Sequence, residues 1–457
     1  HKTKRTINIA GFNLIKGDIN SSFSFVVIDS RKVKEECLFI AIKGESFDGH
    51  NFLSDVERAG AIGVIISEDN LDKSENFNGV VISYSNTVLA LGKIAELWRS
   101  KLKAKVIAIT GSNGKTTTKE FLSVILEQKY KVNKTEYNNN NHIGVPLTIL
   151  STDNSVDVLV LELGTNHFGE IEYTSKIAMP NYALITLIGD SHLEYLLDRQ
   201  GVLKEKFALY EETVKNNGRI FVNSDDELLF NKCKEIENKI TFGFNNYADF
   251  KGEIIGTDDY GKTKLNIKYN NNDLNLTLPV YGITSAKNVL AAVSMAIELG
   301  LNKDELINGI NKLGLIKGRL NIYELNDVLI IDDTYNANPE SMKAALELVN
   351  SINVKKNKIV VLGDMYELGN YTEQKHIELA EQIYKTNINK IFLVGKATEF
   401  TSKHLSKLGV KHFYNNNREQ IVEQLKVTNI NDSLILFKGS RGMKIEQFIP
   451  IITERVS

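Results

Sequence analysis

The residues best suited to chemistry lie in one short stretch, residues 105–120, which reads KVIAITGSNGKTTTKE. Its apolar and largely β-branched start predicts a short buried strand, and a helical pattern follows the glycine turn. Strand, glycine turn and helix in this order are typical of a phosphate-binding loop, whose backbone N–H groups surround phosphate oxygens. We therefore expect a nucleotide-binding loop that contains Gly111, Ser112, Asn113, Gly114, Lys115, Thr116 and Thr117.

Lys115 and Thr116 carry the functional groups of this loop. A lysine at this position can reach the β- and γ-phosphates of a nucleotide, and a threonine hydroxyl can hold Mg²⁺. The usual spacing places a glycine five residues before Gly114, where this chain has Ile109. The alternative is a glycine turn with an incidental Lys-Thr pair, but the flanking strand and helix favour the phosphate loop.

Two more predicted strands end on side chains that can bind a metal ion. Residues 157–161, DVLVL, are apolar after Asp157 and lead to Glu162, and residues 182–188 lead to a polar turn that contains His192. Ligands of nucleotide-binding sheets lie beyond the carboxyl ends of parallel strands. Glu162 is therefore placed to hold Mg²⁺ opposite Thr116, and His192 takes the analogous position. Taken singly, the glutamate could instead cap a turn and the histidine could be structural.

Polar clusters elsewhere suit a charged substrate. Residues 29–31 read DSR and residues 43–50 read KGESFDGH, and each follows a predicted strand. Charged and hydroxyl groups beside glycines suit an anionic ligand such as a diphosphate, although either segment alone also fits a solvated loop. Residues 138–141, NNNN, must form a loop whose amides could bind a polar substrate. Lys204 and Lys206 lie on a predicted helix, where the pattern alone indicates solvent-exposed lysines.

Composition excludes several classes of protein. The 457 residues are 42% hydrophobic, which is ample for several cores, and their formal net charge is −2. Such a charge provides no global attraction to nucleic acid or acidic membranes. Cys37 and Cys233 lie far apart, which favours a reducing compartment. We find no apolar run of membrane-spanning length and no signal-peptide pattern, so we expect a soluble, cytoplasmic protein.

Three regions with different patterns organise the chain. Residues 1–84 alternate short strands with polar turns, which predicts a small α/β domain. Residues 85–314 contain the phosphate loop and predict a central parallel sheet of the phosphate-loop ATPase type, with a hairpin-like insert at 250–279. Residues 315–457 alternate strands with helices, which predicts a Rossmann-like, doubly wound sheet. Residues 314–318 read as a hinge.

Polar clusters follow three predicted strands of the C-terminal region, at residues 332–333, 363–364 and 438–441. Each alone fits a solvated loop. Because the strand ends of a parallel sheet share one edge, we expect the three clusters to bind a ligand together.

Together these motifs resemble the Mur ligase family of bacterial wall synthesis, across all three regions. Residues 110–120 resemble the phosphate loop of this family. Residues 41–52, 138–150 and 162–171 are similar to other motifs of the family. Residues 331–346 (IDDTYNANPESMKAAL), 361–369 (VLGDMYELG) and 438–446 (KGSRGMKIE) are typical of one branch. That branch joins D-alanyl-D-alanine to UDP-N-acetylmuramoyl-tripeptide, through an acyl phosphate.

The resemblance implies that the protein is an ATP-dependent amide ligase that uses two Mg²⁺ ions. Lys115, Lys206, His192 and Arg319 would be its catalytic residues. Thr116 and Glu162 would hold the first ion, while His192 and a carbamylated Lys206 would lie at the second. We also expect a monomer that binds no nucleic acid and does not insert into a membrane.

The resemblance also implies how the substrates are bound. Asn288 would lie near adenine, Arg319 at the γ-phosphate and Asp333 at the ribose. The UDP part would contact Ser30, Arg31, Lys43 and Asp48. The sugar-peptide would lie along Asn140, Asn141 and Thr165. The acceptor dipeptide or the reacting groups would face Asn336, Asn338, Ser440 and Arg441.

The chain departs from the family pattern at four positions, Leu187, Ala208, Thr284 and Ser285, near the metal and adenine sites. Alternative interpretations are a sibling ligase that adds a single amino acid, folylpolyglutamate synthetase, or a nucleotide-binding scaffold without catalysis. The sequence leaves open whether the tripeptide ends in lysine or diaminopimelate.

Overall fold

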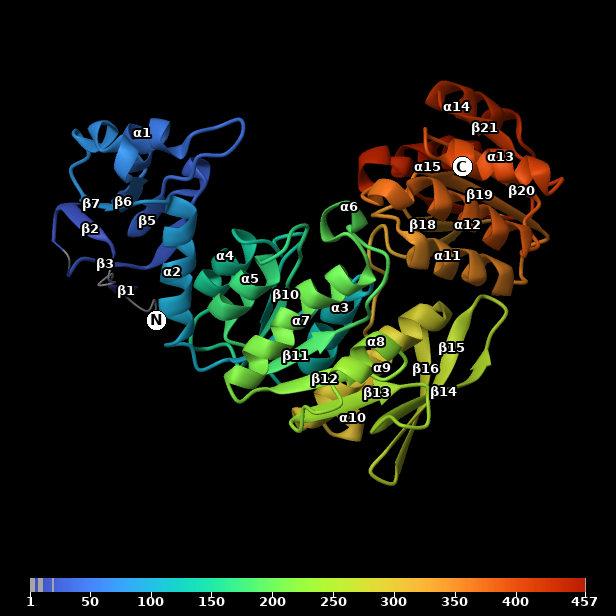
Figure 1. The fold of residues 1–457 in the computed structure, drawn as a ribbon, viewed down its shortest axis with the longest axis horizontal. Coiled ribbons are helices and arrows are strands. Elements are labelled where there is room, and N and C mark those ends of the chain that lie inside the picture. Colours follow the sequence, from blue (N-terminus) through green and yellow to red (C-terminus); the bar gives the residue numbers. More distant parts are fainter. Residues whose placement is uncertain (1–4, 7–10, 19, 457) are drawn as a thin grey trace.

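The N-terminal part of the chain forms a small α/β unit around one five-stranded sheet (Figure 1). In the computed structural model, which describes residues 5–6, 11–18 and 20–456, the strand order is β2-β7-β6-β5-β4. Strands β4 to β7 pair in parallel, and β2 runs antiparallel at one edge. The strands are β2 (Asn13–Lys16), β4 (Phe25–Val27), β5 (Cys37–Ile40), β6 (Ala61–Ser67) and β7 (Val80–Tyr84). Helix α1 (Leu53–Arg58) and the short pair β1 (Arg5–Thr6) and β3 (Ser22–Phe23) complete the unit.

The central part is a nine-stranded sheet whose middle strand carries the glycine turn. Its order is β16-β15-β14-β13-β12-β11-β8-β10-β9. The parallel strands are β8 (Lys105–Thr110), β9 (Val132–Lys134), β10 (Val158–Glu162), β11 (Tyr182–Ile185), β12 (Arg219–Asn223) and β13 (Lys239–Gly243). Since β8 lies between β10 and β11, three strand ends meet at the loop.

The predicted hairpin-like insert is a three-stranded extension of the same sheet. Strand β14 (Phe250–Thr257) pairs in parallel with β13, and β15 (Lys262–Tyr269) and β16 (Asn272–Tyr281) follow as an antiparallel meander. Two other strands end at different residues from those predicted. Glu162 is the last residue of β10 rather than the first after it, and β11 stops at Ile185 instead of 188.

Helices cover both faces of the central sheet (Figure 1). They are α2 (Thr87–Arg99), α3 (Lys115–Leu126), α4 (Gly144–Ser151), α5 (Glu170–Ala178), α6 (Leu193–Leu196), α7 (Arg199–Lys215), α8 (Glu227–Lys232), α9 (Gly282–Glu298) and α10 (Lys303–Asn311). Buried apolar residues of α3 and α9, including Leu122, Ile125 and Leu290, form one core with β8, β10 and the meander.

The C-terminal part is a doubly wound six-stranded sheet with the order β17-β18-β22-β19-β20-β21. Strand β17 (Asn321–Leu325) is an antiparallel edge, and the others pair in parallel. The latter are β18 (Val328–Asp333), β19 (Asn357–Gly363), β20 (Lys390–Val394), β21 (Phe413–Asn415) and β22 (Ser433–Lys438). The helices are α11 (Pro339–Ser351), α12 (Thr372–Tyr384), α13 (Thr398–Lys407), α14 (Arg418–Val427) and α15 (Ile449–Val456). This confirms the predicted fold class.

Helix α2 joins the first two parts. It is buried along most of its length, and it contacts β6 of the N-terminal sheet as well as α4 and α5 of the central part. Trp98 donates its ring N–H to the carbonyl of Thr152 at 2.8 Å, and Arg99 donates to the carbonyl of Ala178 at 2.7 Å. Within the described residues, the helices are all too short or too polar to cross a lipid bilayer.

Candidate active site

The glycine turn between β8 and α3 is held against the segment that follows β11. Gly111 has φ 145° and Gly114 has φ 79°, in the region that favours glycine. A Cβ atom on Gly111 would overlap the hydroxyl of Thr186. The N–H of Ser112 donates to the carbonyl of Leu187 at 2.9 Å, and the N–H of Gly189 donates to Ser112 Oγ at 2.8 Å. The turn therefore has the geometry in which a helix N-terminus can surround a phosphate.

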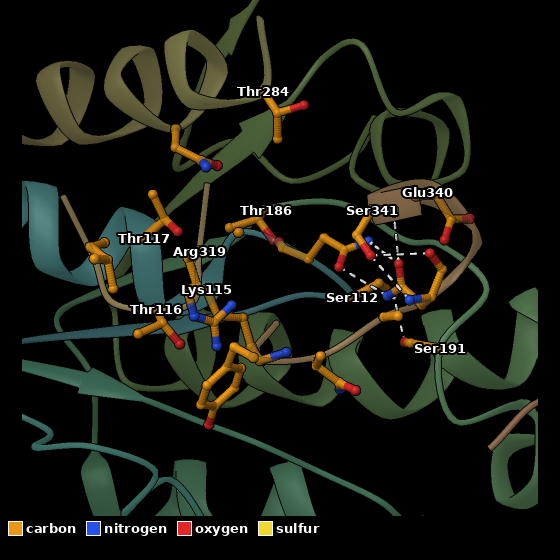
Figure 2. A pocket seen from close by; sticks show the side chains of 18 of the residues that line it. Ser112, Lys115, Thr116, Thr117, Thr186, Ser191, Thr284, Arg319, Glu340 and Ser341 are labelled. Carbon is orange, nitrogen blue, oxygen red and sulfur yellow. Dashed lines mark hydrogen bonds between the residues drawn. The ribbon is translucent and has the colours of Figure 1, made fainter. Parts of the chain in front are cut away.

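Lys115 begins α3 and points back over the turn. Its ammonium group donates to the carbonyl of Gly111 at 2.7 Å. Burial lowers the pKa of Lys115, the charge of Glu162 raises it, and the charge of Arg319 lowers it further. A lysine in a partly desolvated cleft interacts strongly with phosphate, because little water competes for it. Figure 2 shows Lys115, Thr116 and Arg319 together in the cavity.

Glu162 and Thr116 form a set of oxygen donors next to the turn. Thr116 Oγ1 donates to Glu162 Oε1 at 3.1 Å, and the amide of Asn140 donates to the same oxygen at 2.9 Å. Glu162 Oε2 is buried without a hydrogen-bond donor and lies 3.8 Å from the ammonium of Lys119. Carboxylate and hydroxyl oxygens are the ligands that Mg²⁺ prefers. These residues therefore fit a magnesium ion.

No group of three or more His, Cys, Asp or Glu side chains among the described residues is arranged to hold a metal by itself. Mg²⁺ usually binds through one or two carboxylates and completes its coordination with phosphate oxygens and water. A site of this kind needs the nucleotide to be complete.

His192 lies at the start of α6 and pairs with a residue of the C-terminal part. Its Nδ1 is 2.6 Å from Glu367 Oε2, and the N–H of Glu194 donates to the carbonyl of Glu367 at 3.1 Å. Burial lowers the pKa of His192, although the contact with Glu367 opposes the shift. Both His192 (φ 54°) and Glu367 (φ 62°) have left-handed backbones, so the contact is made by two tight turns.

Lys206 corrects one prediction. It is not a solvent-exposed lysine: it is fully buried on α7, and its amine has no hydrogen-bond partner among the described residues. Burial lowers the pKa of Lys206 well below its usual value, and the charge of Lys115 lowers it further. Its neighbour Glu205 is also buried and accepts bonds from Thr165, Gly169 and Ile171. Lys204, by contrast, is exposed as predicted.

Arg319 lies just after residues 314–318, and its guanidinium stacks on the ring of Tyr335 at 4.1 Å from the centroid. Arg441 lies 6.0 Å from the same ring. Asp333 accepts bonds from the Lys438 ammonium at 2.6 Å and from the Leu320 N–H at 3.1 Å. The hinge segment and the polar edge of the C-terminal sheet therefore meet around one aromatic side chain.

Asn338 and Ser440 have contacts that the sequence did not predict. Asn338 exchanges side-chain amide bonds with Asn113 at 2.9 Å, and it also caps α11 through the N–H of Ser341. Ser440 is buried, where it accepts from the N–H of Tyr366 at 2.8 Å and donates to the carbonyl of Ala337 at 3.3 Å. Both residues hold the walls of the cavity in place.

A cavity of about 650 Å³ lies between the central and C-terminal parts and gathers most predicted residues (Figure 2). Those that line it are Ser112, Asn113, Gly114, Lys115, Thr116, Thr117, Asn140, Asn141, Glu162, Thr165, His192, Asn288, Arg319, Asp333, Asn336, Asn338, Ser440 and Arg441. Leu187, Thr284 and Ser285, which depart from the family pattern, also line it. Gly111 and Lys206 are buried and do not line the cavity.

Ser30, Arg31, Lys43 and Asp48 do not line this cavity. They follow β4 and β5, two neighbouring parallel strands of the N-terminal sheet. Arg31 donates to Asp29, which lowers the pKa of that carboxyl to about 2. Asp48 lies 2.6 Å from Nδ1 of the buried His50. These residues form a second polar cluster, away from the phosphate loop.

Sequence reasoning missed Glu367 and Tyr335 as site residues. Both lie in segments that were matched to the family, directly after strands of the C-terminal sheet. Their position after β19 and β18 was the sequence signal that could have identified them as site residues. Their partners, His192 and Arg319, lie 175 and 16 positions away in the sequence, and no local pattern reports such pairs.

Comparison with known proteins places the whole chain in one group. Residues 22–99 match the family model described as "Mur ligase family, catalytic domain", residues 109–296 match "Mur ligase middle domain", and residues 318–441 match "Mur ligase, glutamate ligase domain". UDP-N-acetylmuramoyl-tripeptide–D-alanyl-D-alanine ligase of Bacillus subtilis (strain 168) is 34% identical over 99% of both chains. The Escherichia coli (strain K12) protein of the same name is 32% identical over 94% of this chain and 93% of its own.

Solved structures agree. The crystal structure of MurF from Acinetobacter baumannii has a TM-score of 0.85 and 31% identity, over 95% of this chain and 94% of that one. MurF ligase from Thermotoga maritima in complex with ADP has a TM-score of 0.83 and 27% identity, over 94% of this chain and 97% of that one.

Proposed function

The chain belongs to the Mur ligase family, and we propose that it joins D-alanyl-D-alanine to UDP-N-acetylmuramoyl-tripeptide at the expense of ATP. The observation that carries the proposal is the single cavity between the phosphate loop and the polar edge of the C-terminal sheet. Such a cavity can bring a nucleotide, an acid and an amine together. The named relatives supply the identity of the acid and the amine.

Joining a carboxylate to an amine in water is unfavourable, and a carboxylate resists nucleophiles. Transfer of the γ-phosphoryl group to the terminal carboxylate of the tripeptide yields an acyl phosphate and ADP. The dipeptide amine then attacks the acyl carbon, phosphate leaves with the C–O bonding electrons, and the nitrogen loses a proton. The loop amides, Lys115 and Arg319 would neutralise charge on the transferred group.

We assign the metal-binding roles to Thr116, Glu162, His192 and Lys206. Mg²⁺ held by these residues would offset the negative charge of the ATP phosphates. The buried amine of Lys206, whose pKa is lowered and which has no hydrogen-bond partner among the described residues, supports carbamylation. Its nitrogen can add to the carbon of CO₂ and lose a proton, which gives a carbamate with anionic oxygen donors. An unmodified ammonium there would be repelled by the ions.

The remaining assignments follow the division of the chain. Residues 1–84 would bind the UDP part through Ser30, Arg31, Lys43 and Asp48. Residues 85–314 would bind ATP, with Asn288 near adenine and with Asn140, Asn141 and Thr165 along the sugar-peptide. Residues 315–457 would bind the dipeptide, with Asp333 at the ribose and with Asn336, Asn338, Ser440 and Arg441 near the acceptor or the reacting groups.

The test is phosphate release from ATP by the purified protein with Mg²⁺ and UDP-tripeptide. D-Alanyl-D-alanine should stimulate release, and single amino acids should not. Stimulation by one amino acid would favour a sibling ligase, and no release with any acceptor would favour a scaffold. Running the assay with lysine- and diaminopimelate-containing tripeptides would identify the third residue.

Replacing Lys115 with alanine should abolish ADP formation and leave the fold intact. The lysine is the loop's only side-chain cation, so the phosphates lose their principal counter-charge. ADP formation and thermal unfolding would be measured together. Lys356→Ala, whose side chain is 90% exposed, is the matched control. Turnover of Lys115→Ala at the wild-type rate would contradict the assignment.

A further inference from the structure

Six acidic side chains line the cavity, and one of them has fewer ion-pair and hydrogen-bond partners than the others. The five that already contact basic groups, hydroxyls or amide N–H groups are Glu162, Glu170, Asp190, Asp333 and Glu340. For Glu367, the only side-chain partner within the described residues is His192. Its carboxylate is 41% exposed, so it is accessible from the cavity.

No lysine or arginine side chain among the described residues pairs with the Glu367 carboxylate, whereas Asp190 and Asp333 each pair with one. A carboxylate that opens into a cavity without a lysine or arginine partner can bind an incoming cation.

Glu367 also lies beside the basic segment at the end of β22. The preceding residue, Tyr366, donates its N–H to Ser440, and its ring would be 2.9 Å from a Cβ atom on Gly442. Arg441, between these two residues, lines the same cavity, and its 65% exposed side chain lies 3.1 Å from Glu446. A carboxylate and a guanidinium from adjoining segments therefore line one cavity, which suits a short zwitterion.

We propose that Glu367 binds the ammonium group of the acceptor dipeptide, while Arg441 binds its carboxylate. This inference rests on the proposed function and deepens it. His192 follows β11 directly beside the phosphate loop, so the contact between His192 and Glu367 places the amine binding site at the side of the cavity where the carboxyl group is activated. Glu367 would thus select an acceptor with a free amino group. The ammonium group gives one proton to the Glu367 carboxylate, and the neutral amine then attacks the acyl phosphate.

A purely structural role for Glu367 makes a different prediction. If Glu367 only held His192 in place, its loss would slow formation of the acyl phosphate and would affect every nucleophile equally. Hydroxylamine separates the two roles, because it attacks acyl phosphates, is largely uncharged at neutral pH and needs no ammonium site.

The experiment compares Glu367→Gln with the wild type, using D-alanyl-D-alanine or hydroxylamine as the nucleophile. The glutamine keeps the size of the side chain and removes its charge. We expect kcat/KM for the dipeptide to fall about 100-fold, as for a charge pair from which the bound dipeptide has displaced the water. Hydroxylamine-dependent ADP release should fall at least tenfold less. Equal losses, or a loss that higher Mg²⁺ restores, would overturn the proposal.

Controls separate this inference from the proposed function. Glu373→Gln, on the exposed face of α12, removes the same charge and should leave both rates unchanged. Glu367→Asp keeps the charge and should recover part of the dipeptide rate. If Glu367→Gln does not fold, N-propionyl-D-alanine, which lacks the amine, should inhibit the wild type only at concentrations far above the KM of the dipeptide. Tight inhibition would contradict the proposal. Absence of dipeptide-dependent turnover in the wild type would instead contradict the proposed function.

Discussion

Among single residues, Lys206 has an unfavourable environment, because it brings an amine into the protein interior without a hydrogen-bond partner among the described residues. The folded state favours the neutral amine, whereas the unfolded chain keeps the proton up to the usual lysine pKa of 10.5. The unfolded state therefore binds more protons at neutral pH, and stability should rise as pH increases toward that value.

Lys206→Met should consequently stabilise the protein and abolish ligase activity. In buffer free of dissolved CO₂ at neutral pH, we expect a gain of roughly 1–3 kcal/mol in the free energy of unfolding, since an unpaired buried polar group is removed. The gain should shrink as pH approaches 10.5. Denaturant unfolding across pH measures it. Lys204→Met, two residues away and exposed, should show no such gain, and a destabilised Lys206→Met would contradict the argument.

At the scale of elements, the turn between β8 and α3 depends on a close approach as well as on a glycine backbone. Gly111→Ala places a methyl group on the hydroxyl of Thr186, so the turn must move and its amides lose their positions. We expect ADP and Mg²⁺ to raise the melting temperature of the wild type but not of this variant. Gly409→Ala is the matched control, because Gly409 also has a positive φ, 73°, but nothing lies within 4 Å of the added atom.

Sequence patterns predicted those features of the site that depend on neighbours along the chain. The strand before Gly111 and the helix after Lys115 were visible as a motif, and the parallel-strand rule brought Glu162 and Thr116 together. Lys206 was misread because helix periodicity does not report what packs against the helix. The His192–Glu367 pair joins segments 175 positions apart, and the Arg319–Tyr335 stack joins the residue after the hinge to the segment after β18, so both required the folded structure.

At the scale of the whole molecule, charged side chains connect the central and C-terminal parts. Arg199 lies 2.6 Å from Asp190 and 2.7 Å from Glu340, and Lys375 lies 2.7 Å from Asp190. Asp190 and Arg199 belong to the central part, while Glu340 and Lys375 belong to the C-terminal part. These pairs favour the closed cavity, and salt should weaken the exposed ones.

Arg199→Ala should therefore shift the protein toward an open arrangement. Small-angle X-ray scattering should show a larger radius of gyration for the variant than for the wild type at low salt, and the difference should decrease as salt opens the wild type. Arg58→Ala removes an arginine that pairs with Asp55 inside the N-terminal part, so it should leave the scattering unchanged. Identical scattering of Arg199→Ala and the wild type would show that other contacts hold the two parts together.

Helix α2 has a consequence for which substrates can react. It is packed on β6 on one side and on α4 and α5 on the other, so it sets a constant spacing between the N-terminal polar cluster and the phosphate loop. If the N-terminal polar cluster holds the UDP part as we propose, this spacing fixes how far the peptide stem must reach. A stem that is too short would stop before the ATP phosphates and one that is too long would overshoot them, so helix α2 would act as a molecular ruler for stem length.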